Sequence, residues 1–128
     1  MTAVPDANDH REDILDLPTL EELLSLDDGA TGLLLEMAGL FREDGPQRIA
    51  QLKAACEAGD THAAGEAAHA LKGAAGTLGA VELRALAGEA ERLARQTEIP
   101  AILALIPALE ASYPRFIAAL DGFIQARS

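Results

Sequence analysis

Apolar residues recur at intervals of three and four along most of the chain, the spacing that places them on one face of an α-helix. The last segment shows the longest series, and its phase continues through Pro107 and Pro114. Its members are Ile102, Ile106, Leu109, Tyr113, Phe116, Ile117, Leu120 and Ile124. No stretch alternates apolar and polar residues for long enough to predict a strand. The pattern predicts an all-α fold, in which one bent helix from Pro100 onward is favoured over two unrelated helices.

A short helix and a long helix are predicted in the first half of the chain. The short one covers about residues 19–26, because Pro18 marks its start and an Asp-Asp-Gly run its end. The long one covers about residues 30–59 and is either kinked at Pro46 or divided there into two helices in near continuity. Its apolar series is Leu33, Leu34, Met37, Leu40, Phe41, Ile49, Leu52 and Cys56.

Two shorter helices are predicted between this segment and the last one. Asp60 or Thr61 can cap a helix that ends near Gly79, and another covers about residues 81–96. The inward positions of the second are Leu83, Leu86, Ala90 and Leu93. Four principal amphipathic helices with short connections predict an antiparallel up-down four-helix bundle with a short extra N-terminal helix.

Length and composition fit a single domain. The chain has 128 residues and is 49% hydrophobic but only 3% aromatic, so Leu, Ile, Val and Ala must fill the core. We assign the bundle to residues 17–127. Residues 1–16 are polar and acidic and contain Pro5, and we interpret them as a flexible lead or linker.

Charge and cysteine content exclude several function classes. A formal net charge of −11 argues against a nucleic-acid or anionic-membrane surface, which needs a basic patch. The single cysteine, Cys56, excludes a disulfide framework within the chain and a cysteine-rich zinc site, and its spacing predicts a core position. No secretory segment is found, and no apolar run approaches the roughly 18 residues of a membrane span. We therefore expect a cytoplasmic location and, because no large exposed apolar face is evident, a monomer.

Helical geometry places His69 on the surface. With about 100° of rotation per residue and Leu71 at the centre of the inward face, His69 lies about 160° away. The inward stripe contains Ala64, Ala67, Ala68, Leu71, Ala74, Ala75 and Leu78. The outer half contains His62, Gly65, Glu66, His69, Lys72, Gly73 and Gly76. The imidazole is therefore expected to be exposed.

The presence of glycine at two positions near this histidine is explained if another macromolecule must approach the ring closely. Gly73 and Gly76 leave bare backbone on the surface beside His69, at a cost of about 1 kcal/mol each in a helix. Lys72 adds a cation within reach of an anion attached to the ring. A partly neutral, exposed imidazole is a competent nucleophile, so this group of residues suits a phosphoryl acceptor.

Plainer interpretations of these residues remain open at this point. An exposed histidine is usually an ordinary surface residue, and the glycines could serve a crossing with another subunit. His62 is the one rival acceptor, but its helical neighbours include Glu66 and no cation. The Glu-x-x-His spacing of Glu66 and His69 is typical of di-iron bundles, yet those need a second such pair and inward-facing ligands, so no metal site is expected.

The stretch from Ala68 to Ala80 resembles the histidine-containing phosphotransfer (Hpt) domains of multistep two-component phosphorelays. The family pattern is close to Ala-His-x-Leu-Lys-Gly followed by small residues and Leu-Gly-Ala, and the stretch follows it throughout. The resemblance covers about residues 18–126. It is supported by Phe41, the Ala-Gly-Asp run at 58–60, Leu83, Glu91 and Arg95. Ala90 departs from the pattern, because a leucine usually precedes the glutamate.

This resemblance implies a phosphoryl carrier without autonomous catalysis. His69 would accept the group from an aspartyl-phosphate of a receiver domain and pass it to the aspartate of another, with Lys72 stabilising the phosphoryl group and Gly73 and Gly76 giving access. It implies receiver domains as partners and no cofactor of its own, with Mg²⁺ expected on the receiver. The chain would be either a stand-alone carrier or the C-terminal module of a hybrid sensor histidine kinase, in which case it would be classed with the kinase.

Four further residues are candidates for supporting or docking roles: Glu66, Glu91, Arg95 and Phe41. No Walker-type loop or nucleotide-binding glycine box accompanies the histidine. Phosphoryl transfer needs positioning and charge neutralisation, and Lys72 alone supplies little of the latter, so a partner must complete the site. The rival hypothesis is a helical docking or scaffold bundle that carries no phosphoryl group.

Overall fold

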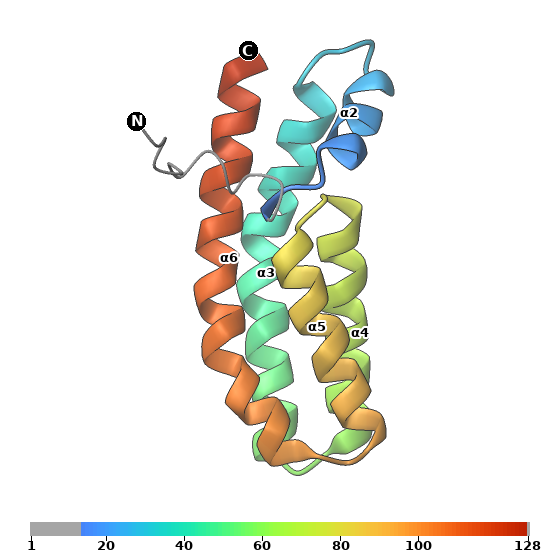
Figure 1. Ribbon diagram of the computed structural model, residues 1–128, viewed down its shortest axis with the longest axis vertical. Coiled ribbons are helices and arrows are strands. Elements are labelled where there is room, and N and C mark those ends of the chain that lie inside the picture. Colours follow the sequence, from blue (N-terminus) through green and yellow to red (C-terminus); the bar gives the residue numbers. More distant parts are fainter. Residues whose placement is uncertain (1–13, 128) are drawn as a thin grey trace, which may run out of the picture.

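The computed structural model describes residues 14–127, and all five of its long elements are helices. They are α2 (Leu17–Ser25), α3 (Gly32–Glu57), α4 (Thr61–Thr77), α5 (Val81–Arg95) and α6 (Ile99–Arg127). Figure 1 shows α3 and α6 running the length of the molecule, α4 and α5 side by side along part of it, and α2 near one end. The predicted four-helix bundle with a short extra N-terminal helix is confirmed.

Short turns separate the helices where the sequence places them. Asp60 caps α4, because its Oδ1 atom accepts a hydrogen bond from the Ala63 N–H at 3.0 Å. Gly59 and Gly79 have φ values of +70°, a conformation that glycine adopts without strain, and each follows the end of a helix. These turns reverse the chain, so neighbouring helices run antiparallel.

The helix α3 continues through Pro46 as one element because another helix compensates for the proline. Proline has no N–H, so the carbonyl of Arg42, four residues earlier, lacks its helical donor. The Tyr113 hydroxyl of α6 lies 3.2 Å from this oxygen and 3.2 Å from the Phe41 carbonyl oxygen, and can donate to either. Of the two predicted alternatives, the continuous helix is correct.

The crossing of α3 and α6 at this point requires glycine. A Cβ atom at Gly45 would lie 2.4 Å from Cε1 of Tyr113, inside the van der Waals distance. The absence of a side chain therefore lets the tyrosine ring pack against the α3 backbone, where burial raises the pKa of its hydroxyl. The same ring lies 5.6 Å from the ring of Phe41, which in turn lies 5.8 Å from that of Phe116.

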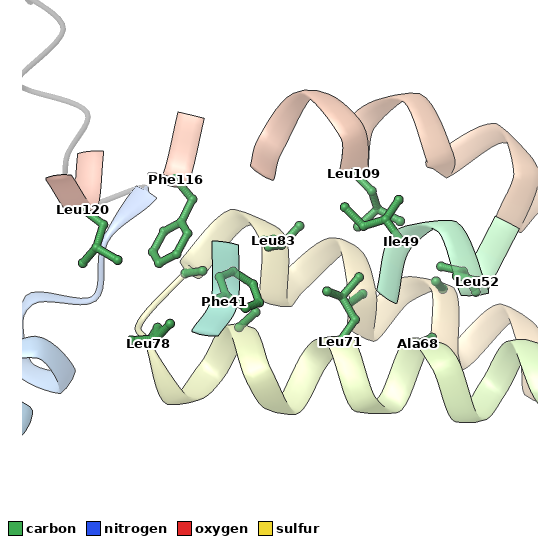
Figure 2. Close-up of a cluster of buried hydrophobic side chains, with 14 of the residues drawn as sticks. Phe41, Ile49, Leu52, Ala68, Leu71, Leu78, Leu83, Leu109, Phe116 and Leu120 are labelled. Atoms are coloured by element: carbon green, nitrogen blue, oxygen red, sulfur yellow. The ribbon is translucent and has the colours of Figure 1, made fainter. Parts of the chain in front are cut away.

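The core is built from aliphatic and alanine side chains that converge from all the long helices (Figure 2). Fully buried examples include Leu34, Leu52, Leu71, Leu83, Ile102, Leu109, Phe116 and Leu120. The predicted inward stripe of α4 is confirmed, with Ala64, Ala68, Leu71 and Ala75 at 0% exposure. Leu40 is the exception among the inward positions expected on α3, because it is 59% exposed.

The predicted boundary between the N-terminal lead and the bundle needs correction. The predicted lead included residues 14–16, but Leu15 is buried and forms an isolated β-bridge with Ala80. The Asp16 N–H also donates to the Gly79 carbonyl oxygen at 2.8 Å, so this segment is bound to the α4–α5 turn. The rest of the predicted lead, residues 1–13, lies outside the described residues.

The helix α6 is more apolar than expected, because no apolar run in the sequence was expected to approach the length of a membrane span. Among the described residues, it is the one helix long and apolar enough to cross a membrane, with an 18-residue window of mean hydropathy 1.3. Eight of its side chains are buried against the bundle: Ile102, Ile106, Leu109, Ser112, Phe116, Leu120, Phe123 and Ile124. Its apolar residues are those of a core helix, and α6 is not a convincing membrane span.

Candidate functional site

His69 lies in the middle of α4, on the side that faces α5 and solvent. Its side chain is 71% exposed, in agreement with the rotation predicted from the sequence. Its neighbours on the buried face, Ala68 and Leu71, are fully buried, so the core holds the helix while the imidazole stands free of it. The two turns of α4 around the ring form a groove with α5 that includes Glu66, Glu91 and Arg95.

Glu91 of α5 connects the ring to the rest of the site. Its Oε2 atom lies 2.7 Å from Nδ1 of His69, and its Oε1 atom lies 2.6 Å from Nζ of Lys72. Its side chain is only 11% exposed. The hydrogen bond from Lys72 is the main cause that holds the pKa of Glu91 below its ordinary value, and the bond from His69 acts in the same direction.

This geometry assigns the tautomer of His69. An ionised carboxylate can only accept hydrogen bonds, so the proton must be on Nδ1. In the neutral ring, Nε2 then carries the lone pair. Because the side chain is mostly exposed, the nucleophilic nitrogen is accessible to a partner, while Glu91 fixes the orientation of the ring.

Two cations pair with the Glu91 carboxylate that contacts His69, one from α4 and one from α5. Lys72 lies one turn after His69 and is 33% exposed. Arg95 lies one turn after Glu91, with its Nη2 atom 3.3 Å from Glu91 Oε2, and is 71% exposed. Glu91 therefore serves three partners at once. His69, Lys72, Glu91 and Arg95 were all candidates from the sequence, but their spacing does not predict that Glu91 contacts the other three.

The two glycines of the motif have different surroundings. Gly73 is exposed, and a Cβ atom there would meet nothing within 4 Å, so the surface beside the ring is open as predicted. A Cβ atom at Gly76 would lie 3.1 Å from Nε of Arg84. Gly76 is therefore covered by an arginine of α5 and is not bare surface, which corrects the expectation that it opens the approach to His69.

The other candidates occupy less central positions. Glu66 is 72% exposed and pairs with His62 at 3.3 Å. It lines the groove beside His69 and, within residues 14–127, forms no hydrogen bond or ion pair with the ring. Phe41 was expected as a docking residue, but its side chain is 3% exposed and packs in the core. It contributes only to a shallow apolar groove between α3 and α4, which Met37 and Leu40 also line.

Neither the cysteine nor the acidic side chains form a second site in the described residues. Cys56 is buried, and this burial, with Glu57 as a smaller cause, raises the pKa of its thiol, which keeps it protonated. Within residues 14–127, no three histidine, cysteine or acidic side chains cluster in a way that could hold a metal ion. The chemistry of the described residues is therefore concentrated at His69, Lys72 and Glu91.

Comparisons with known proteins identify the family of this chain. The family model of the Hpt domain matches residues 36–121, so the chain belongs to the Hpt family. A solved structure, histidine-containing phosphotransfer protein B (HptB) from Pseudomonas aeruginosa PAO1, is 28% identical in sequence. The likeness covers 88% of this chain and 95% of that one, with a TM-score of 0.77. No curated protein matches significantly. The chain is thus a carrier-type phosphotransfer domain of phosphorelay signalling.

Proposed function

We propose that Nε2 of His69 accepts a phosphoryl group from the aspartyl-phosphate of one receiver domain and returns it to the aspartate of another. The observation that carries this proposal is the 2.7 Å contact between Nδ1 of His69 and the Glu91 carboxylate, which in the neutral ring places the lone pair on Nε2 of a side chain that is 71% exposed. A buried or doubly hydrogen-bonded imidazole would not be available to a macromolecular donor.

The phosphoryl transfer needs only the histidine of this chain and the aspartyl-phosphate of the receiver as reacting groups. The lone pair of Nε2 attacks phosphorus, the P–Nε2 bond forms, and the bond from phosphorus to the aspartyl oxygen breaks, which releases a carboxylate. The ring gains positive charge, and the Nδ1 proton faces the Glu91 carboxylate, which stabilises that charge. The reverse sequence discharges the ring onto the next aspartate.

Lys72 supports the group once it is on the ring. Its ammonium has three donors, and one of them is used by Glu91 Oε1 at 2.6 Å. The others are free to turn toward phosphoryl oxygens on the neighbouring histidine. Lys72 is held by Glu91 rather than mobile, so little side-chain entropy is lost when it engages the phosphoryl group. A metal on the receiver, expected to be Mg²⁺, would neutralise the remaining charge, and this chain needs no cofactor of its own.

The receiver is expected to dock on the open surface around Gly73. The shallow apolar groove of Met37, Leu40, Ala74 and Leu78 adjoins this surface and offers an apolar contact. Leu40 is 59% exposed, so much of its apolar side chain is open to a partner. We further propose that the domain acts in the cytoplasm as a monomer, either alone or as the C-terminal module of a hybrid sensor kinase.

Phosphoramidate tests the acceptor without a partner, because this small donor modifies exposed histidines directly. Wild type, His69→Gln and His62→Gln are treated in parallel and analysed by intact mass, and any adduct is checked for stability in acid and alkali. We expect one acid-labile, alkali-stable phosphoryl group that is absent only from His69→Gln, with unchanged helicity. An adduct that survives this substitution, or none in wild type, would favour the docking bundle.

A further inference from the structure

Nearly all cations in the described chain are neutralised by its own acidic groups. Seven arginine and lysine side chains form ion pairs: Arg42–Asp121, Arg48–Asp44, Lys72–Glu91, Arg92–Glu89, Arg95–Glu91, Arg115–Glu82 and Arg127–Glu21. Within residues 14–127, this leaves only Arg84 and Lys53 without an acidic partner. An unpaired arginine is unexpected in a chain of net charge −11, so its position is informative.

Arg84 is held against the helix that carries the acceptor histidine. It belongs to α5, and its Nε and Cδ atoms would lie 3.1 and 3.2 Å from a Cβ atom at Gly76 of α4. Its side chain therefore crosses α4 where glycine leaves room for it. Gly76 lies seven residues after His69, so both are on the same face of the helix, about 10 Å apart along its axis.

The acid nearest to this position along the groove is engaged elsewhere. Asp16 lines the same groove as Arg84, Lys72 and Gly76. Its Oδ2 atom accepts a hydrogen bond from the Thr19 hydroxyl at 2.8 Å, and no ion pair with Arg84 is formed. Arg84 is an exposed residue, so its side chain can be reached by a partner that covers this face of α4.

We propose that Arg84 binds a carboxylate of the receiver domain docked over His69 and thereby contributes to the choice of receiver. This inference rests on the proposed function. A receiver that reaches Nε2 of His69 must cover the neighbouring turns of α4, where Gly73 is open and Arg84 lies over Gly76. A guanidinium pairs with a carboxylate through two parallel hydrogen bonds, which gives both attraction and orientation. Because Arg84 lies two helical turns from the ring, it acts on the docking of the receiver and does not contact the transferred phosphoryl group.

Receiver transfer kinetics test this role. The probe is a purified receiver domain of the same organism, chosen as the one that transfers fastest to wild type after loading with acetyl phosphate and Mg²⁺. Arg84→Glu is expected to lower kcat/KM by about tenfold or more, chiefly because KM rises. The dependence of kcat/KM on salt concentration should become weaker than in wild type. Arg84→Lys should retain part of the activity, because it keeps the charge but loses the planar fork.

Lys53→Glu is the matched control, because it makes the same change in charge at the other unpaired cation. Lys53 lies on α3 and lines neither groove beside His69 or Arg84. Its variant should transfer within about twofold of wild type, because Lys53 lines neither groove and an exposed charge without a direct contact is screened by salt. Loading of Arg84→Glu and Lys53→Glu by phosphoramidate should equal that of wild type.

Each other outcome contradicts the inference in an identifiable way. Equal losses in Arg84→Glu and Lys53→Glu would show that net charge matters and the contact does not. Slower loading of Arg84→Glu by phosphoramidate would indicate a disturbed His69. If neutralising Asp6, Asp9, Glu12 and Asp13 in the full chain removes the effect, Arg84 serves the chain's own acids. If wild type loads with phosphoramidate but exchanges with no receiver, the proposed function fails as well.

Discussion

Gly45 of α3 and Gly73 of α4 both lie inside long helices, yet their surroundings are opposite. A side chain at Gly45 would collide with the Tyr113 ring, whereas one at Gly73 would meet nothing within 4 Å. Both glycines cost the helix about 1 kcal/mol relative to alanine. The first makes possible a contact inside the molecule. The second brings no contact within the described chain and leaves the surface beside His69 open, as the proposed docking of a receiver requires.

The charges around the two glycines differ in the same way. Near Gly45, Arg42 pairs with Asp121 alone, and the tyrosine hydroxyl satisfies backbone carbonyls. Near Gly73, Glu91 faces Lys72, His69 and Arg95 together. One carboxylate cannot use all the hydrogen-bond donors of these three side chains. The remaining donors can bind an anionic group that arrives later at the site.

Among variants that retain His69, replacing Glu91 should produce the largest effect on the site. In Glu91→Ala, Nδ1 of His69 loses its acceptor, so the ring orientation and tautomer are no longer held. A hydrogen bond to a charged group contributes about 1.5–3 kcal/mol, and each 1.36 kcal/mol is a factor of about ten. Phosphoramidate loading should therefore slow by about 10- to 100-fold. The rate is measured by intact mass over time, and the tautomer by nitrogen NMR of the imidazole.

Two further variants sharpen this result. Glu91→Gln keeps a carbonyl oxygen that can accept from Nδ1, so it should load faster than Glu91→Ala. Glu89→Ala removes a carboxylate of the same helix that pairs only with Arg92, and its loading should match wild type. If all three variants load at the wild-type rate, the contact between Glu91 and His69 has no role in the chemistry.

Gly45→Ala should lower the free energy of unfolding, although alanine in place of glycine usually stabilises a helix. Its methyl group would force the Tyr113 ring away from α3 and weaken the hydrogen bond that compensates for Pro46, so unfolding should require about 1–3 kcal/mol less. Urea denaturation measures this change. Gly39→Ala is the control in the same helix: its Cβ atom meets nothing within 4 Å, so it should stabilise by about 0.5–1 kcal/mol. Equal effects of the two would contradict the packing role of Gly45.

Gly73→Ala should have the smallest effect on the protein itself. Its methyl group points into open space, so the helix should gain about 0.5–1 kcal/mol in urea denaturation while phosphoramidate loading stays unchanged. Receiver transfer should slow, and Gly73→Leu should slow it further by its bulk. Gly122→Ala, also in open space but on α6, should gain stability without any loss of transfer. A Gly73→Leu variant that transfers normally would refute the access role of this glycine.

Helix phase was the property most readily predicted from the sequence. The three-and-four spacing placed Leu71 inside and His69 outside without reference to the other helices, because one rotation per residue decides both. The same arithmetic failed at Leu40, which has the correct spacing but is exposed. Periodicity identifies a face of a helix, whereas burial also depends on whether a neighbouring helix extends far enough to cover it.

What the sequence alone determined is the set of local features: the approximate helix boundaries, a cap at Asp60 or Thr61, the exposed histidine and the Hpt motif. Contacts between distant segments were decided only in the folded bundle. Tyr113 keeps α3 continuous at Pro46, Glu91 orients His69 from 22 residues away, and Arg84 covers Gly76. Local features follow from backbone geometry within a few residues. The pairing of side chains across helices depends on how those helices cross, and the spacing within one helix does not contain that information.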